Sequence, residues 1–106
     1  MPKYMFEGCY SVEGAKGVAK DGGSARREAL TRVFEGLGGK LECFYFAFGE
    51  VDVFVIGDLP DNETAASAAL AINKAGAASC RTTVLITPEE MDKAARKSVS
   101  YRAPGQ

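Results

Sequence analysis

The sequence predicts a single α+β domain in which strands and helices follow the order β-α-β-β-α-β, with one further helix at the C-terminal end. Three observations support this prediction: strands with alternating apolar residues, helical segments with apolar residues three and four positions apart, and glycine- or proline-containing breaks between them. A chain of 106 residues suits one hydrophobic core. We therefore expect one domain spanning residues 1–106.

The first strand and the first main helix are predicted from their periodicity. Residues 3–10 alternate, and one face of this strand carries Tyr4, Phe6, Gly8 and Tyr10. Ser11 then begins a turn or short helix. Ser24 is a favourable helix cap, and from there apolar residues recur at helical spacing as far as Leu37. The glycines within 36–40 end this helix, because glycine adopts the left-handed conformation without a steric clash.

Two β-rich segments, 40–48 and 51–59, are joined by Gly49 and Glu50, and this predicts an antiparallel hairpin. Both faces of the hairpin are apolar. In the first strand we expect Leu41, Cys43, Tyr45 and Ala47 on one face and Phe44, Phe46 and Phe48 on the other. In the second strand we expect Val51, Val53 and Val55 on one face and Phe54 and Ile56 on the other. Two helices cover only one face of a four-stranded sheet, so the other apolar face predicts a second subunit packed against it.

The remaining elements complete the pattern. Residues 60–62 end the second strand of the hairpin and offer a cap for an alanine-rich helix over 63–76. Residues 81–87 form the fourth strand. The segment 87–90 holds a capping threonine, a proline and a glutamate at the third helical position, so a last helix should extend to about Lys97. This order is the ferredoxin-like α+β pattern, with an antiparallel four-stranded sheet and an extra C-terminal helix.

Composition excludes several classes of function. With 13 basic and 14 acidic residues, the chain has no net positive charge to hold a nucleic acid. No segment has the apolar length of a membrane span or the features of a signal peptide, so we expect a cytoplasmic protein. Histidine is absent, and Cys9, Cys43 and Cys80 are far apart, which indicates free thiols rather than a disulfide framework, a metal site or a haem site. We expect no cofactor.

Charged and hydroxyl residues within apolar strands are candidates for catalysis. A carboxylate that faces a closed interior must be paired or have a raised pKa, and such a group can act as a base. Glu7 and Asp52 are the candidate bases, and Tyr10 and Tyr45 are candidate hydrogen-bond donors in the same cavity. The alternative is structural: the carboxylates lie at strand ends or in ion pairs, and the tyrosines fill the core.

A second candidate site lies at the start of the first main helix. Free N–H groups at a helix N-terminus attract anions. Ser24 and Arg27 lie in this first turn, and Lys16 is close in sequence, so the three residues form a candidate anion site. The alternative is a helix cap that binds nothing.

Several segments resemble those of the GYD-domain family of uncharacterised small bacterial proteins. They are "YSVEGAKGVAKDGGSARREAL", "LGGKLECFYFAFGEVDVFVIGDLPD", "TTVLITPEEMDKAARKSV" and "YRAPGQ". The resemblance implies the dimeric α/β-barrel superfamily, in which two ferredoxin-like subunits bring their sheets together. Gly49 and Asp52 match the ends of the Gly-Tyr-Asp signature, whereas its tyrosine has no counterpart here. The resemblance implies no activity.

Three functions remain open from the sequence. The first is a homodimer, or an oligomer built from dimers, that binds a small molecule as a binding or accessory module. The second is a cofactor-independent isomerase or monooxygenase that acts on a small aromatic or carbonyl compound. The third is a structural assembly subunit. A substrate-sized cavity with a water-excluded carboxylate would favour the enzyme, and a solidly packed interior would favour the structural subunit.

Overall fold

The structure is a computed structural model that describes residues 1–106 as eight elements. In chain order they are β1 (Lys3–Tyr10), α1 (Val12–Asp21), α2 (Gly23–Gly36), β2 (Lys40–Phe46), β3 (Val53–Asp58), α3 (Asn62–Ala75), β4 (Ala78–Leu85) and α4 (Pro88–Ala95). The strands form one antiparallel sheet in the order β2-β3-β1-β4. The predicted ferredoxin-like α+β fold is therefore confirmed.

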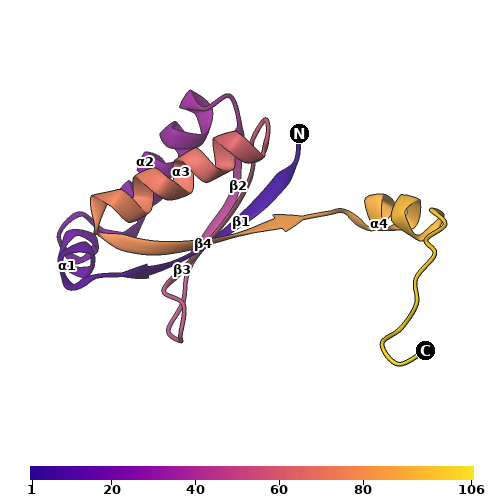
Figure 1. The fold of residues 1–106 in the computed structure, drawn as a ribbon. Coiled ribbons are helices and arrows are strands. Elements are labelled where there is room, and N and C mark those ends of the chain that lie inside the picture. Colours follow the sequence, from indigo (N-terminus) through magenta and orange to yellow (C-terminus); the bar gives the residue numbers. More distant parts are fainter.

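The hydrophobic core lies between the sheet and the helices α2 and α3, which lie on the same side of it (Figure 1). The alternation predicted for β1 is confirmed, because Tyr4, Phe6 and Gly8 are buried on this side. The ring of Phe6 packs edge to face on Phe34 of α2, with ring centroids 5.8 Å apart. The hydroxyl of the buried Tyr4 donates a hydrogen bond of 2.6 Å to Oδ1 of Asn62, the first residue of α3. This bond satisfies the hydroxyl group.

The connection between β1 and α2 is a complete ten-residue helix rather than a turn or a short helix. Ser11 caps α1 by accepting a hydrogen bond from the backbone N–H of Gly14. Gly22 ends α1 and also caps α2, with a positive φ of 86° that glycine adopts readily. The prediction that Ser24 caps α2 is therefore wrong. The sharp corner at Gly22 starts the next helix at Gly23 and places Ser24 inside its first turn.

The hairpin differs from the prediction in one strand and in its turn. The pairing of β2 with β3 shifts between Leu41 and Cys43, so a bulge at Glu42 interrupts the alternation. As a result Leu41 packs against the core on the same side as Phe44, and its predicted placement on the face of Cys43 is wrong. The connection covers residues 47–52 rather than two residues, because β2 ends at Phe46 and β3 begins at Val53.

The fourth strand begins at Ala78, three residues earlier than predicted, because it pairs with β1 along the whole length from Lys3 to Tyr10. The capping box at the start of α4 is confirmed: Thr87 accepts from the backbone N–H of Glu90, whose carboxylate accepts from the backbone N–H of Thr87. The helix ends at Ala95, slightly before the predicted Lys97.

The second face of the sheet has no helix over it (Figure 1). We call it the open face, and its apolar side chains are Met5, Cys43, Tyr45, Phe54 and Ile56. Lys3 lies at one end of this face and forms ion pairs with Glu42 at 3.1 Å and Asp58 at 3.0 Å. The prediction that both faces of the sheet are apolar is confirmed for Val53 and Val55 on the buried side and Phe54 and Ile56 on the open face.

Candidate functional site

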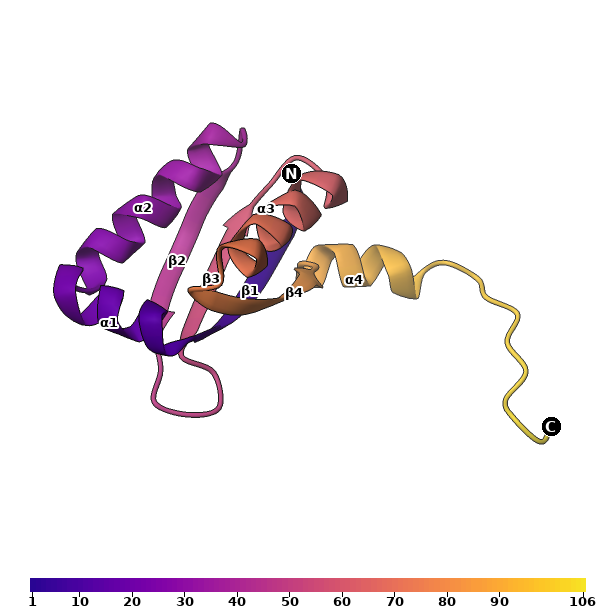
Figure 2. The ribbon, with the colours of Figure 1, turned by 60° about the vertical axis from the view of Figure 1, so that its left-hand side comes forward.

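A cleft separates the two helices that cover the sheet. Helix α2 lies over β2 and helix α3 over β4, at opposite edges of the sheet (Figure 2). The cleft has a volume of about 720 Å³. Its walls are mainly apolar and small, with Ala29 and Val33 from α2 and Ala71 and Ile72 from α3. A smaller hollow of about 50 Å³ lies next to it, above Phe6, Gly8 and Cys80 of the sheet.

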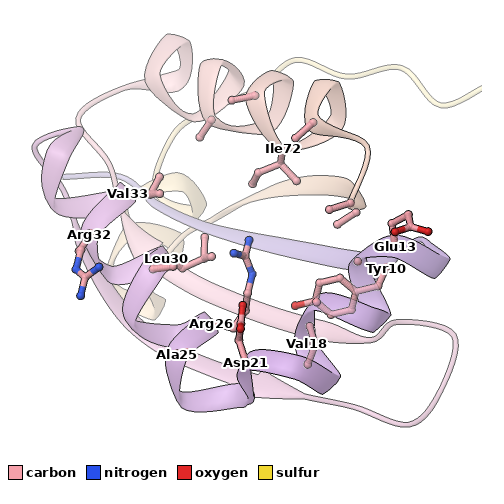
Figure 3. A pocket seen from close by; sticks show the side chains of 18 of the residues that line it. Tyr10, Glu13, Val18, Asp21, Ala25, Arg26, Leu30, Arg32, Val33 and Ile72 are labelled. Atoms are coloured by element: carbon pink, nitrogen blue, oxygen red, sulfur yellow. The ribbon is translucent and has the colours of Figure 1, made fainter.

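The two polar side chains that matter most in the cleft are Tyr10 and Arg26. Tyr10 is the last residue of β1, and Arg26 lies in the first turn of α2. The Arg26 side chain extends into the cleft, and the Tyr10 hydroxyl points toward this side chain (Figure 3). No carboxylate forms an ion pair with Arg26, although Glu13 and Asp21 also line the cleft. The cleft therefore contains an unpaired cation beside a phenolic hydroxyl.

The environment keeps the Tyr10 hydroxyl protonated at neutral pH. Burial raises the pKa of Tyr10, the nearby Arg26 guanidinium group partly offsets this, and the Asp52 carboxylate adds to the increase. A protonated hydroxyl can donate a hydrogen bond, and a guanidinium group presents five N–H donors. The two groups together suit an oxygen-rich anionic or carbonyl group on a bound molecule.

Local structure fixes Tyr10 from its backbone. The backbone N–H of Tyr10 donates a hydrogen bond of 2.8 Å to Oδ2 of Asp52, which lies just before β3. The backbone N–H of Asp52 in turn donates to the carbonyl oxygen of Gly8 at 3.0 Å. Asp52 thus joins the end of β1 to the start of β3 and fixes the backbone of Tyr10 just before the N-terminal end of α1. This is the strand-end role that the structural alternative assigned to the carboxylates.

The structure separates the four candidate catalytic residues. Tyr10 lines the cleft on the helix side, whereas Tyr45 and Glu7 lie on the open face. Glu7 is opposite Arg81 in the sheet, with 3.9 Å between its carboxylate and the guanidinium group. The sheet lies between the two tyrosines, so a cavity within one chain does not contain both.

The three residues of the candidate anion site are also apart from the cleft. Ser24 and Arg27 are exposed on the outer side of α2, and neither lines the cleft. Lys16 is exposed on α1, where its ammonium group lies 3.7 Å from the carboxylate of Glu13. The cation that does point into the cleft is Arg26, which the sequence reasoning missed.

Helical spacing could have identified Arg26. It lies three residues before Ala29, four before Leu30 and seven before Val33, so it shares their face of α2. An arginine on an otherwise apolar stripe is a stronger indication of a site than the adjacent Arg27, which falls on the outer face.

The thiols and the acidic residues form no recognisable metal or redox centre. Cys9, Cys43 and Cys80 are free and partly buried. Burial raises the pKa of the Cys80 thiol, and a hydrogen bond with Thr82 partly offsets this increase. No group of three or more Cys, Asp or Glu side chains is arranged to hold a metal ion. None of the helices has both the length and the apolar character needed to cross a membrane.

Together, the sheet, the helices on one side of it and the cleft between them define a ferredoxin-like α+β protein. Residues 4–95 match the GYD domain family, which confirms the resemblance seen in the sequence, and the chain belongs to this family. The matched residues begin in β1 and end with the last residue of α4. Comparison with curated proteins and with solved structures gives no significant match.

Proposed function

We propose that this protein binds a small organic anion in the cleft between α2 and α3. The observation that supports this most strongly is the Arg26 guanidinium group, which has no ion-pair partner, beside the protonated Tyr10 hydroxyl in a mainly apolar cleft. The Arg26 side chain is exposed, so its guanidinium group is accessible to a ligand, and a guanidinium group forms strong charge-assisted hydrogen bonds with an anion. The cleft volume of about 720 Å³ is within the usual range for small-molecule sites.

The lining favours a particular kind of ligand. One end would be a carboxylate, sulfonate or similar group that accepts hydrogen bonds from Arg26 and Tyr10. The remainder would be an apolar body, aromatic or aliphatic, that lies against Val33 and Ile72. The separation of Tyr10 from Glu7 and Tyr45 by the sheet supports binding rather than acid–base catalysis as the role of this site.

The proposal includes a homodimer formed through the open face. Large apolar surfaces on soluble monomers are uncommon and usually mark an interface. Five apolar side chains lie on this face, and Tyr45 among them is 68% exposed. In such a dimer the two clefts lie on the outer sides, so each remains accessible to a ligand.

A fluorescence titration with 1-anilinonaphthalene-8-sulfonate tests the binding site, because this dye combines an apolar body with one sulfonate. We expect saturable binding to the wild-type protein. In the Arg26→Gln variant the affinity for the dye should fall at least about tenfold, which is the usual effect of losing a charge-assisted hydrogen bond. The neutral dye N-phenyl-1-naphthylamine should bind both proteins equally well.

Arg27→Gln is the matched control, because it removes an equal charge from the next residue of the same helix on its exposed side. It should leave the affinity for the sulfonate dye within about twofold of wild type, since an exposed charge is largely screened. An equal loss of affinity for the sulfonate dye in both variants would show that the effect arises from the net charge of the protein. Unchanged affinity in Arg26→Gln would exclude the proposed site.

A further inference from the structure

The C-terminal arm, residues 86–106, includes α4 and the tail after it and has no partner within its own chain. No residue of α4 is buried. Large apolar side chains along the arm are exposed, with Met91 at 55%, Val99 at 79% and Tyr101 at 75%. Both ribbon views show the arm projecting beyond the end of β4, away from the sheet and the other helices (Figures 1 and 2).

An isolated helix of this size needs a partner. α4 has eight residues, and helices shorter than about 12–15 residues are marginal in water without tertiary packing. The radius of gyration is 16.8 Å, against about 13 Å for a compact domain of this length. The family match extends to Ala95, so α4 is part of the domain and not an appended segment. These observations point to a surface outside the chain that covers α4.

A second cluster of exposed apolar side chains lies at the far end of β2. It consists of Tyr45 in the strand and the fully exposed Phe48 in the loop after it, and we call it the β2 cluster. β2 and β4 are the two edges of the sheet. The arm leaves β4 at the end beside Lys3, whereas the β2 cluster lies at the end beside Gly8. The arm and the β2 cluster are therefore at diagonally opposite corners of the sheet, and they do not meet within one chain.

We infer that the arm of each copy docks on the β2 cluster of the other copy, so that two reciprocal contacts fasten the dimer. This inference rests on the proposed homodimer. A two-fold axis that lies between the two sheets, parallel to them and along the other diagonal, places each arm above the partner's β2 cluster. The strands of the two sheets then cross at nearly a right angle. Both contacts then form at once, and the open faces are covered between them.

The chemistry of the two clusters is complementary. The thioether of Met91 suits the aromatic rings of Tyr45 and Phe48, because sulfur packs favourably against aromatic side chains. From Lys93 onward the arm carries basic residues and no acidic ones, and the loop beside Phe48 is acidic. The basic residues are Lys93, Arg96, Lys97 and Arg102, and the acidic ones are Glu50 and Asp52. A second copy thus supplies both the apolar and the charged partner.

The test uses intermolecular nuclear Overhauser effects from methionine methyl groups in the full chain. The chain has three methionines, of which Met5 lies on the open face, Met91 in the arm and Met1 at the exposed N-terminus. Chains labelled at the methionine methyl groups are unfolded and refolded with deuterated chains that carry protonated Phe and Tyr. We expect effects from both Met5 and Met91 to aromatic protons of the other copy. The Phe48→Ala variant should lose those of Met91 and keep those of Met5.

The outcomes separate the two proposals. Effects from Met5 without any from Met91 would retain the dimer and overturn the docking of the arm. A monomeric protein with no intermolecular effects would overturn both. In sedimentation experiments Met91→Gln should raise the dissociation constant of the dimer about tenfold or more, because an apolar side chain leaves its contact. Glu89→Gln, a polar change in the same helix at a residue with no role in the proposed contact, should alter it less, and equal effects would contradict the docking of Met91.

Discussion

Arg26 and Tyr10 each have a different location from another residue of the same type, Arg27 and Tyr45. Both arginines are exposed, but Arg26 lines the cleft and Arg27 does not, because successive helical residues point about 100° apart. Tyr10 and Tyr45 are both strand residues, yet they lie on opposite sides of the sheet. A sequence motif limited to residue type cannot make these distinctions, whereas the periodicity of the surrounding apolar residues can.

The titration of Tyr10 gives a prediction at this scale. Because Arg26 lowers the pKa that burial has raised, Arg26→Gln should raise the Tyr10 pKa further. Phenolate absorbance against pH measures this change, and the Tyr10→Phe variant identifies the contribution of this residue. A pKa that stays the same or falls in Arg26→Gln would show that the two side chains do not interact.

The same pKa predicts a pH dependence of stability. The folded protein holds the Tyr10 proton more tightly than the unfolded chain, so this contribution is complete below the ordinary tyrosine value of 10.0. It is lost as the pH rises through the higher folded value. The free energy of unfolding should therefore decrease above pH 10 by less in Tyr10→Phe than in wild type, as measured by urea denaturation. An equal decrease in both would exclude this linkage.

Two glycines of α1 give a matched pair of stability predictions. A Cβ at Gly14 would overlap the backbone carbonyl of Ala77, whereas a Cβ at Gly17 would meet nothing within 4 Å. Gly17→Ala should raise the free energy of unfolding by about 0.5–1 kcal/mol, since alanine favours the helix. Gly14→Ala should lower it by about 1–3 kcal/mol through overpacking. Urea denaturation measures both, and a stabilising Gly14→Ala would contradict the close contact of α1 with the segment before β4.

Among the elements, sequence patterns predict those with strong local signals and miss those set by tertiary contacts. The capping box of α4, the alternation of β1 and the periodicity of α2 and α3 all have local causes, and these elements were predicted correctly. The bulge at Glu42 has no such signature, because it depends on how β2 pairs with β3. It moved Leu41 to the other face. The start of β4 at Ala78 likewise depends on the length of β1.

The cleft could not be predicted from the sequence. Its existence depends on the positions of α2 over β2 and of α3 over β4, and helix periodicity gives the buried face but not the distance between two helices. The small side chains of Ala71 and Ala75 in α3 line the cleft, whereas Ala65 and Ala68 of the same helix are buried in the core.

The cap of α3 provides a prediction for one element. Oδ1 of Asp61 accepts hydrogen bonds from the backbone N–H and the hydroxyl of Thr64, which lower the pKa of this carboxyl group. Its contribution to stability is complete above the ordinary value of 3.8 and is lost as the pH falls through the lower folded value. Asp61→Ala should therefore be less stable than wild type at pH 7, with a smaller difference near pH 2.

Asp61→Asn is the control for this prediction, because asparagine also caps helices but does not titrate in this range. Its difference from wild type should be smaller at pH 7 than that of Asp61→Ala. Guanidinium denaturation at the two pH values measures both variants. A deficit in Asp61→Ala that is equally large near pH 2 would show that the carboxylate form is not what stabilises the helix.

For the whole molecule, the open face and the C-terminal arm are the surfaces that the single chain leaves without partners. The proposed homodimer accounts for both, and it predicts how charge on the open face affects assembly. Ile56→Lys should give a monomer, because a lysine ammonium group would be buried at the centre of the interface. Leu70→Lys introduces the same charge at an exposed apolar residue of α3 and should remain dimeric. Light scattering after size-exclusion chromatography measures the mass, and a monomeric wild-type protein would contradict the proposed dimer.

The central claim, that an organic anion binds between α2 and α3, is tested most directly by the location of a bound anion. The measurement is a titration of the ¹⁵N-labelled protein with 1-anilinonaphthalene-8-sulfonate, followed through backbone amide chemical shifts. Binding in the cleft predicts that the largest changes occur at Gly14, Gly17, Ala29 and Ala71, which line it. Changes centred on Met5, Phe54 and Ile56 of the open face, with the amides of the cleft unaffected, would contradict the account.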